Sequence, residues 1–408
     1  MVQASFDQLV SSRALLPVEA RVLLLSLAET PHDLLLEELE RPDLDWGRLI
    51  WLAGKEKASS HLWKVLRQLP GGSIPPERLA ELQRVATAVD FRTLHLQGQL
   101  VRVLRTLEAV GIDTVLLKGA GLAATAYPTF IARPMYDLDL LVRREQGQAA
   151  WDALRAAGWI HNEATCPAAF YVGHHHLPPL DDPVGMGIAV ELHTAPWSGA
   201  VELSTEAIWR EARAAAVGGR EVLVPCANHQ ILHIATHFAW GHGLRMGAWR
   251  AFEDLRQLIA AGDVKWTEFV ELAREARGGT CCYWTFSVAR RLAGVPVPEF
   301  VTDALRPQLP SSALEALERH FIGAMFHFGP AQCPSDRVGK MLWTAAMAPR
   351  RSGHGRVRPW SRETEWVSLS GAPRSQRLRD RLRHHLAQVA TWRSYVGAVL
   401  MPPQASRS

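Results

Sequence analysis

The stretch Met135-Tyr136-Asp137-Leu138-Asp139-Leu140-Leu141-Val142 combines two carboxylates with the apolar pattern of a buried strand. Alternate residues of a strand point to the same face, so Asp137 and Asp139 project together while Leu138 and Leu140 face the opposite side. Two carboxylates held this close repel each other unless a cation lies between them. Oxygen ligands of this kind suit Mg²⁺ that carries a nucleotide phosphate. The stretch therefore predicts a metal site at the start of a strand.

The segments on either side of this strand supply further parts of a phosphate site. Upstream, the apolar run 112–117 predicts a strand that leads into Lys118-Gly119-Ala120-Gly121 and then into a helix. A glycine turn before a helix presents backbone N–H groups to an anion, and Lys118 adds a positive charge. Arg133 could neutralise phosphate oxygens. Downstream, 187–193 predicts another strand, with Glu191 in an apolar setting.

At these residues the chain resembles the DNA polymerase β-like nucleotidyltransferase superfamily, and within it an uncharacterised bacterial nucleotidyltransferase family. The resemblance spans about residues 40 to 300 and implies an α+β fold, with a small mixed β-sheet nucleotidyltransferase core embedded in a mostly helical protein. The matching residues are Leu117-Lys118-Gly119-Ala120, Tyr127, Arg133-Pro134, Asp137 with Asp139-Leu140-Leu141-Val142, and Glu191-Leu192-His193.

The resemblance implies transfer of a nucleoside monophosphate from a Mg²⁺-bound NTP, with ATP as the expected donor, to a hydroxyl of an acceptor. The acceptor would be a small molecule, a peptide or a protein, and pyrophosphate would be released. Asp137 and Asp139 would bind Mg²⁺, and Glu191 would either complete a second metal site or take the acceptor's proton. The residues expected to hold the phosphates are Lys118, Gly119, Ala120, Gly121 and Arg133, and those expected to support the site from nearby are His193, His237 and Asp254.

One departure from the superfamily pattern keeps a second function open. Many members have Gly-Ser at the phosphate turn, and the serine hydroxyl contacts phosphate, whereas this chain has Gly119-Ala120. Phosphate binding would then rest on backbone amides and Lys118. A nucleotide-binding or scaffold protein without catalytic activity is the alternative that this difference predicts.

Two other functions fit parts of the sequence. The stretch 119–124 matches the dinucleotide fingerprint G-x-G-x-x-A. That fold expects one acid at the end of the second strand, whereas this chain has two acids at the beginning of theirs. Histidines could bind zinc in a metal-dependent hydrolase, although no H-E-x-x-H motif is present. His229, His233 and His237 recur every four residues, His174, His175 and His176 form a run, and His193 follows Glu191.

The composition of the chain indicates its expected cellular compartment and its kind of partner. The net charge is +4 and no lysine-rich block precedes the C-terminal region, so a nucleic-acid partner is not expected. Five cysteines without C-x-x-C spacing are typical of a reducing cytoplasm. No apolar run reaches membrane-spanning length and the N-terminus lacks a signal-peptide pattern, so a cytoplasmic protein without a membrane partner is predicted.

The 408 residues are enough for several regions. The pattern predicts a helical N-terminal region over 1–75 and a nucleotidyltransferase core over 76–215, which opens with a long helix from Pro76 to about Gly111. A helical domain over 216–335 would wall the acceptor pocket, and 336–408 would form a basic linker and helix. Within this division, residues 203–300 are expected to return to helices, at 228–240, 249–261 and 266–277.

Overall fold

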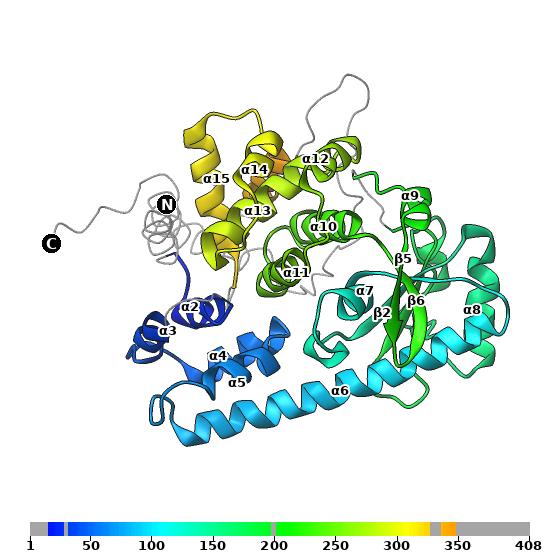
Figure 1. Ribbon diagram of the computed structural model, residues 1–408, viewed down its shortest axis with the longest axis horizontal. Helices are drawn as coiled ribbons and strands as arrows, with labels where there is room; N and C mark the ends of the chain where they lie inside the picture. The colour runs from blue at the N-terminus through cyan, green and yellow to red at the C-terminus, as the bar shows by residue number, and fades with distance from the viewer. Residues whose placement is uncertain (1–14, 28–31, 197–200, 327–335, 348–408) are drawn as a thin grey trace, which may run out of the picture.

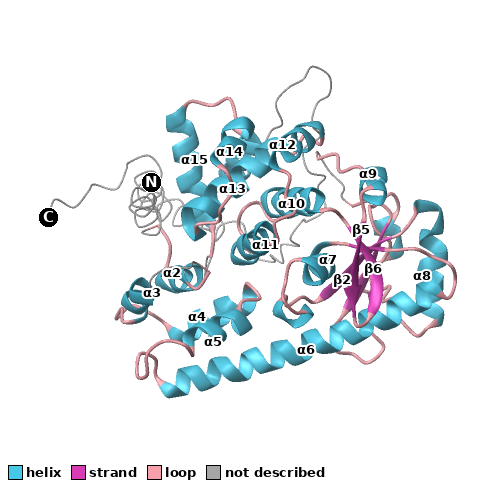
Figure 2. Ribbon diagram, in the orientation of Figure 1, coloured by secondary structure: helices cyan, strands magenta, loops and turns pink. Residues whose placement is uncertain are grey.

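The computed structural model describes residues 15–27, 32–196, 201–326 and 336–347, whose arrangement is shown in Figure 1. In this part of the chain the strands form one six-stranded sheet in the order β3-β4-β2-β1-β6-β5. The sheet lies toward one end of the molecule, and helices make up most of the rest (Figure 2). The predicted α+β fold, a small mixed sheet within a mostly helical protein, is confirmed.

The sheet mixes parallel and antiparallel pairs. β2 pairs in parallel with β4 and antiparallel with β1, and β1 pairs in parallel with β6. β3 and β5 form antiparallel edges. The strands are β1 (Val115–Leu116), β2 (Asp137–Leu141), β3 (Leu180–Asp181), β4 (Ala189–His193), β5 (Arg213–Val217) and β6 (Arg220–Val224).

Along the sequence, helices precede the strands of this sheet, lie between them and follow them. Those before and within the sheet region are α2 (Val18–Leu25), α3 (His32–Leu39), α4 (Trp46–Lys55), α5 (Ser59–Leu66), α6 (Pro76–Glu108), α7 (Lys118–Thr125), α8 (Gly147–Ala156) and α9 (Thr205–Arg210). Those after it are α10 (Ala227–Thr236), α11 (Ala248–Ala260), α12 (Trp266–Glu275), α13 (Gly279–Ala293), α14 (Glu299–Leu305), α15 (Ser311–Ala324) and α16 (Asp336–Met347). None of the helices in these described segments combines the length and apolar character that a membrane span requires.

Helix α6 connects the two parts of the molecule (Figure 1). It has 33 residues, and a proline at its first position fits because that residue needs no N–H partner. At 1.5 Å per residue it is about 50 Å long. Leu82 near its beginning packs into a core of helices, whereas Leu96 and Leu100 pack into the core of the sheet. The long helix predicted from Pro76 is confirmed.

The hydrophobic residues gather into two main cores. One contains β-strand residues such as Leu138, Leu140 and Val190 together with the second half of α6. The other joins N-terminal helices to the helices that follow the sheet, and both Leu52 and Phe252 are fully buried in it. The two helical regions expected at 1–75 and 216–335 thus share one core in the described residues, while the division of the chain into four regions stays a prediction.

The expectation that residues 203–300 form a helical region is wrong at one place. β5 and β6 form a hairpin, and β6 joins the central sheet beside β1. The turn is Gly218-Gly219, with both φ angles positive (57° and 76°), and two such residues match the twist of a two-residue hairpin. The glycine pair between two runs of β-compatible residues is the signal that predicts this hairpin. The basic helix expected from Arg377 to Trp392 lies outside the described residues.

Candidate active site

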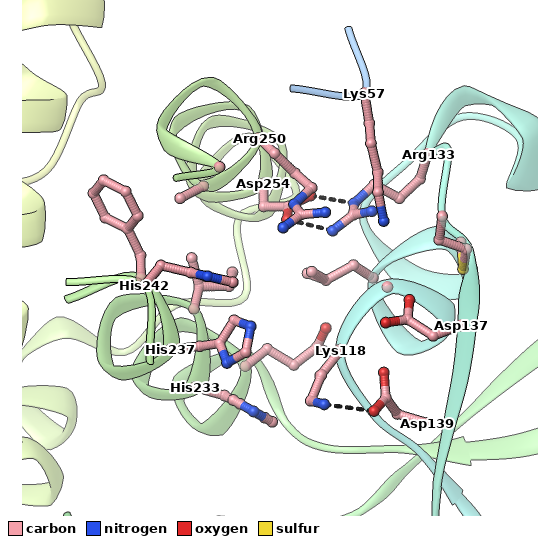
Figure 3. A pocket seen from close by; sticks show the side chains of 18 of the residues that line it. Lys57, Lys118, Arg133, Asp137, Asp139, His233, His237, His242, Arg250 and Asp254 are labelled. Atoms are coloured by element: carbon pink, nitrogen blue, oxygen red, sulfur yellow. Dashed lines mark hydrogen bonds and ion pairs between the residues drawn. The ribbon is translucent and has the colours of Figure 1, made fainter. Parts of the chain in front are cut away.

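A cavity of about 440 Å³ lies between the sheet and the helices that follow it (Figure 3). β2, β4 and the first turn of α7 form one wall, which we call the sheet wall. α10, its π-helical extension η4 (His237–Gly241) and α11 form the opposite wall, which we call the helical wall. The ionisable side chains that line the cavity are Lys57, Lys118, Arg133, Asp137, Asp139, His175, His176, Glu191, His233, His237, His242, Arg250 and Asp254.

The sheet wall carries three carboxylates. Asp139 and Glu191 are paired residues on the neighbouring parallel strands β2 and β4, so their side chains share a face of the sheet. Asp137 lies two residues before Asp139 and lines the same cavity. Leu138 and Leu140 alternate with the two acids and are buried in the core behind them. The structure therefore brings together the three acids that the sequence predicts as metal ligands.

Two cationic groups meet at Asp139. Lys118 Nζ donates to Asp139 Oδ1 at 2.5 Å, and His193 Nε2 lies 2.9 Å from the same oxygen. Glu191 Oε2 lies 3.8 Å from Lys118 Nζ and 3.5 Å from His193 Nε2. Lys118 thus stands between the carboxylates of Asp139 and Glu191, and His193, predicted to support the site, contacts both of them.

These contacts set the charges of the sheet wall. Burial alone would raise the pKa of Asp139, but Lys118 and His193 outweigh burial and hold that pKa well below its usual value. Burial lowers the pKa of His193, yet its contacts with Asp139 and Glu191 leave the pKa raised. The pKa of Lys118 is raised as well, because the same carboxylates overcome the effect of burial. Asp139 is therefore an ionised carboxylate that requires positive charge beside it.

The turn into α7 is closely packed. Lys118 adopts a φ of 44°, which is unusual for a residue with a side chain and marks a strained position. A Cβ on Gly121 would lie 2.6 Å from the carbonyl oxygen of Leu116, so only glycine allows α7 to approach β1 this closely. A Cβ on Gly119 would lie 3.2 Å from Met135 Sδ. The glycines of this turn therefore bring the start of the helix against the strands that carry the acids.

Ala120 stands where many superfamily members have serine. Its side chain is buried in the core of the sheet, and the residue does not line the cavity, whereas Lys118 and Gly119 do. Backbone N–H groups in the first turn of a helix have no intrahelical acceptor and can donate to an anion. A phosphate at this turn would therefore contact backbone amides and Lys118, as the sequence predicts.

Arg133 joins the sheet wall to the helical wall. Its guanidinium forms a two-point contact with Asp254 of α11, with Nε to Oδ1 at 2.6 Å and a terminal nitrogen to Oδ2 at 2.8 Å. Tyr127 also donates its hydroxyl hydrogen to Asp254 Oδ1, at 2.6 Å. Arg133 and Asp254 are both buried. Asp254 thus supports the site through Arg133, and the phosphate contact predicted for Arg133 stays a prediction.

The helical wall carries three histidines that face the acids across the cavity (Figure 3). Burial lowers the pKa of His233 to about 3 and that of His242 to about 4. Burial also lowers the pKa of His237 well below its usual value, and the neighbouring His242 adds to this effect. These rings are neutral at physiological pH, so the helical wall offers hydrogen-bonding groups at these positions rather than positive charge.

Two cations that the sequence does not single out complete the cavity. Lys57 comes from the N-terminal helices and Arg250 from α11, and both point into the space above the acids (Figure 3). Neither forms an ion pair with a carboxylate in the described part of the chain, although Lys57 Nζ lies 4.4 Å from the centre of the Tyr136 ring. Burial, aided by Arg250, lowers the pKa of Lys57 to about 7. Burial and the neighbouring Arg133 lower the pKa of Arg250.

A helix cap places these two cations side by side. α11 begins at Ala248, after the N-cap residue Gly247, which has no side chain to cap it, and the carboxylate of Glu56 accepts from the backbone N–H groups of Gly247 and Trp249 at 3.2 and 3.1 Å. Glu56 is buried and directly precedes Lys57. Lys57 adopts a φ of 60°. The cap thus holds the N-terminal helices against the first turn of α11, which contains Arg250, four residues before Asp254.

The sheet wall has donors suited to a metal ion. One ligand atom each from Asp139, Glu191 and His193 lies within 4.8 Å of the others. Asp137 lines the same end of the cavity, and carboxylate oxygens are the ligands that Mg²⁺ prefers. Since Lys118 already provides a cation at Asp139, the residues fit a divalent cation that replaces the ammonium group.

The three histidines spaced four apart on α10 and η4 do not meet at one point. His233 and His237 line the cavity, whereas His229 lies beside Glu211 and Cys226 outside it. Among the described residues these three do not form a group of metal ligands. These three histidines therefore do not supply the ligand set of a zinc hydrolase, whereas ligand atoms of His174, His175 and His176 do lie within 4.8 Å of one another.

Carboxylates on neighbouring strands beside the N-terminus of a helix form the architecture of a nucleotidyltransferase. Comparison with known families agrees, because a family described as uncharacterised nucleotidyltransferases matches residues 42–294, well over half of the chain. The chain belongs to this nucleotidyltransferase family. In the same comparisons, no curated protein and no solved structure matched the chain.

Proposed function

We propose that this protein transfers a nucleoside monophosphate from a Mg²⁺-bound NTP, with ATP as the leading candidate, to a hydroxyl group of a small molecule, peptide or protein. The observation that carries the proposal is the pairing of Asp139 with Glu191 across β2 and β4, beside Asp137 and the first turn of α7. Membership of the nucleotidyltransferase family supports the reaction class.

Different carboxylates would bind the metal ion and accept the proton of the acceptor. Asp137 and Asp139 would hold Mg²⁺, which when bound would neutralise charge on the phosphates. The acceptor oxygen forms a bond to the α-phosphorus as the bond from that phosphorus to the bridging oxygen breaks and pyrophosphate leaves. Glu191 is half-buried at the cavity edge and takes the proton of the acceptor hydroxyl. The proton of the acceptor hydroxyl thus ends on Glu191, and the electron pair of the broken bond leaves with pyrophosphate.

The cationic side chains of the cavity would bind the triphosphate. Lys118 contacts Asp139 and lines the cavity at the first turn of α7, so its ammonium group would also contact a phosphate bound at this turn. Lys57 and Arg250 line the cavity without a carboxylate partner in the described residues, and both would contact the β- and γ-phosphates. Hydrogen bonds to charged groups contribute about 1.5–3 kcal/mol each. The neutral histidines of the helical wall would then face the acceptor.

A nucleotide-binding protein without turnover is the second candidate. The short contact between Lys118 and Asp139, together with Ala120 in place of serine, favours this candidate because both weaken metal and phosphate binding. Binding of Mg²⁺–NTP without transfer to any acceptor would support it.

The experiment that tests the main proposal is calorimetric titration of each of the four NTPs, with and without Mg²⁺. The proteins are the wild type, the double variant Asp137→Asn/Asp139→Asn, and the control Asp152→Asn, whose exposed carboxylate on α8 contacts Gln148. Mg²⁺-dependent binding of one NTP that only the double variant loses would identify the donor and start an acceptor search by mass shift. Binding that the double variant keeps would overturn the site, provided that circular dichroism shows both variants folded.

A further inference from the structure

A second cluster of metal-binding side chains lies outside the cavity. Glu211 follows the last residue of α9, Cys226 immediately precedes α10, and His229 lies in the first turn of α10. None of the three lines the cavity that holds Asp137 and Asp139. One ligand atom from each residue lies within 4.8 Å of the other two.

The distances within the cluster match a tetrahedral zinc site. Cys226 Sγ lies 3.3 Å from His229 Nδ1 and 3.8 Å from Glu211 Oε2, and His229 Nδ1 lies 3.7 Å from Glu211 Oε2. Zinc bonds of about 2.3 Å to sulfur and about 2.0–2.2 Å to nitrogen or oxygen give ligand separations of roughly 3.3–3.7 Å at the tetrahedral angle. The three atoms therefore already stand at the corners of such a site to within a few tenths of an ångström.

The chemistry of the three donors selects the metal. A thiolate and an imidazole favour zinc over Mg²⁺ or Ca²⁺, which prefer oxygen ligands. Cys226 and Glu211 also line a surface groove with further carboxylates, from Asp263, Glu268 and Glu271. The groove gives a cation an entry path from solvent and leaves room for water as a fourth ligand.

We propose that Glu211, Cys226 and His229 bind one zinc ion, with water as the fourth ligand. Binding forms bonds from zinc to Sγ, Nδ1 and a carboxylate oxygen, and the thiol proton passes to solvent. The ion would join the end of α9 to the start of α10, the helix that carries His233 into the cavity. Zinc would thus brace the helical wall from outside, and this site does not depend on the proposed transferase activity.

The test uses cobalt as a spectroscopic substitute for zinc. Full-length protein freed of metal is titrated with Co²⁺, and the near-ultraviolet charge-transfer band between the thiolate and cobalt is measured. Zinc is then added to test whether it displaces the cobalt. We expect one equivalent of Co²⁺ to produce the band and one equivalent of zinc to abolish it. Zinc should also raise the melting temperature.

Two variants make the test specific. Cys226→Ser should lose the band and the zinc-induced shift in melting temperature while remaining folded, because serine is favoured at the position before a helix. Cys166→Ser removes another partly exposed free thiol and should keep both signals. Absence of the band in the wild type, or its persistence in Cys226→Ser, would overturn the proposal. Cobalt binding without a thiolate band would show binding at other residues and would overturn it equally.

Discussion

The two walls of the cavity manage charge in different ways. On the sheet wall, Asp139 is neutralised at short range by Lys118 and His193, so its carboxylate is already paired. On the helical side, Lys57 and Arg250 are held near each other without carboxylate partners in the described residues, beside neutral histidines. Unbalanced positive charge that is partly buried is costly unless a ligand supplies the anion. The difference agrees with the proposal that the sheet wall holds a metal cation and that the helical side receives the anionic triphosphate.

The strongest test of this comparison removes the contact that joins the two walls. Asp254→Ala leaves the guanidinium of Arg133 buried without its partner, and we expect a loss of about 3–5 kcal/mol in the free energy of unfolding. Tyr127→Phe removes one hydrogen bond to the same carboxylate and should cost about 1 kcal/mol. Urea denaturation measures both. Equal losses in the two variants would show that Arg133 finds another partner and that the walls are not joined through this pair.

The next test concerns the packing of the sheet wall alone. Gly121→Ala places a Cβ 2.6 Å from the carbonyl oxygen of Leu116, and backbone cannot move aside easily. We expect a loss of about 3 kcal/mol, at the upper end for overpacking. Gly54→Ala is the matched control, because α4 leaves open space at that position and alanine favours helix by up to about 1 kcal/mol. A Gly121→Ala protein as stable as wild type would mean that α7 can move away from β1.

The sheet wall could be predicted from sequence because its residues lie within local patterns. Alternation along β2 places Asp137 and Asp139 on one face, and the glycine turn places Lys118 at the start of α7. The apolar run 187–193 predicts the strand that carries Glu191, and the family resemblance implies the role of that residue. What the pattern could not show is that Lys118 contacts Asp139 rather than solvent, since that depends on the φ of one residue.

The helical wall was less predictable because its residues meet through tertiary packing. Glu56 caps α11 by accepting from Gly247, which lies 191 residues later in the chain, and this contact brings Lys57 to the cavity. The spacing of residues along the sequence does not indicate a contact between helices so far apart in the chain. Arg250 and Asp254, four residues apart on α11, share a helix face, and this spacing is a local signal. The hairpin at Gly218-Gly219 is also predictable locally, because a glycine pair between two β-compatible runs favours a two-residue turn over helix.

The smallest expected effect tests whether the helical side receives an anion. Burial lowers the pKa of Lys57 to about 7, so the side chain is charged below that pH and neutral above it. A bound phosphate favours the charged form, and NTP affinity in the wild type should therefore fall as pH rises through about 7. Lys57→Met should bind an NTP about tenfold more weakly at low pH, equivalent to about 1.4 kcal/mol, with the difference shrinking as pH rises.

The variant Lys57→Arg, in the same calorimetric series, tests whether the positive charge at position 57 determines NTP affinity. Arginine stays protonated, so this variant should keep its affinity at high pH, where the wild type loses it. Titration of the NTP itself is common to all three proteins and cancels in the comparison. The same dependence on pH in the wild type and in Lys57→Met would remove Lys57 from the phosphate site. Arg250 and Lys118 would then be the cations left to hold the triphosphate, which would shift the anion site toward the sheet wall and reverse the division of charge between the two walls.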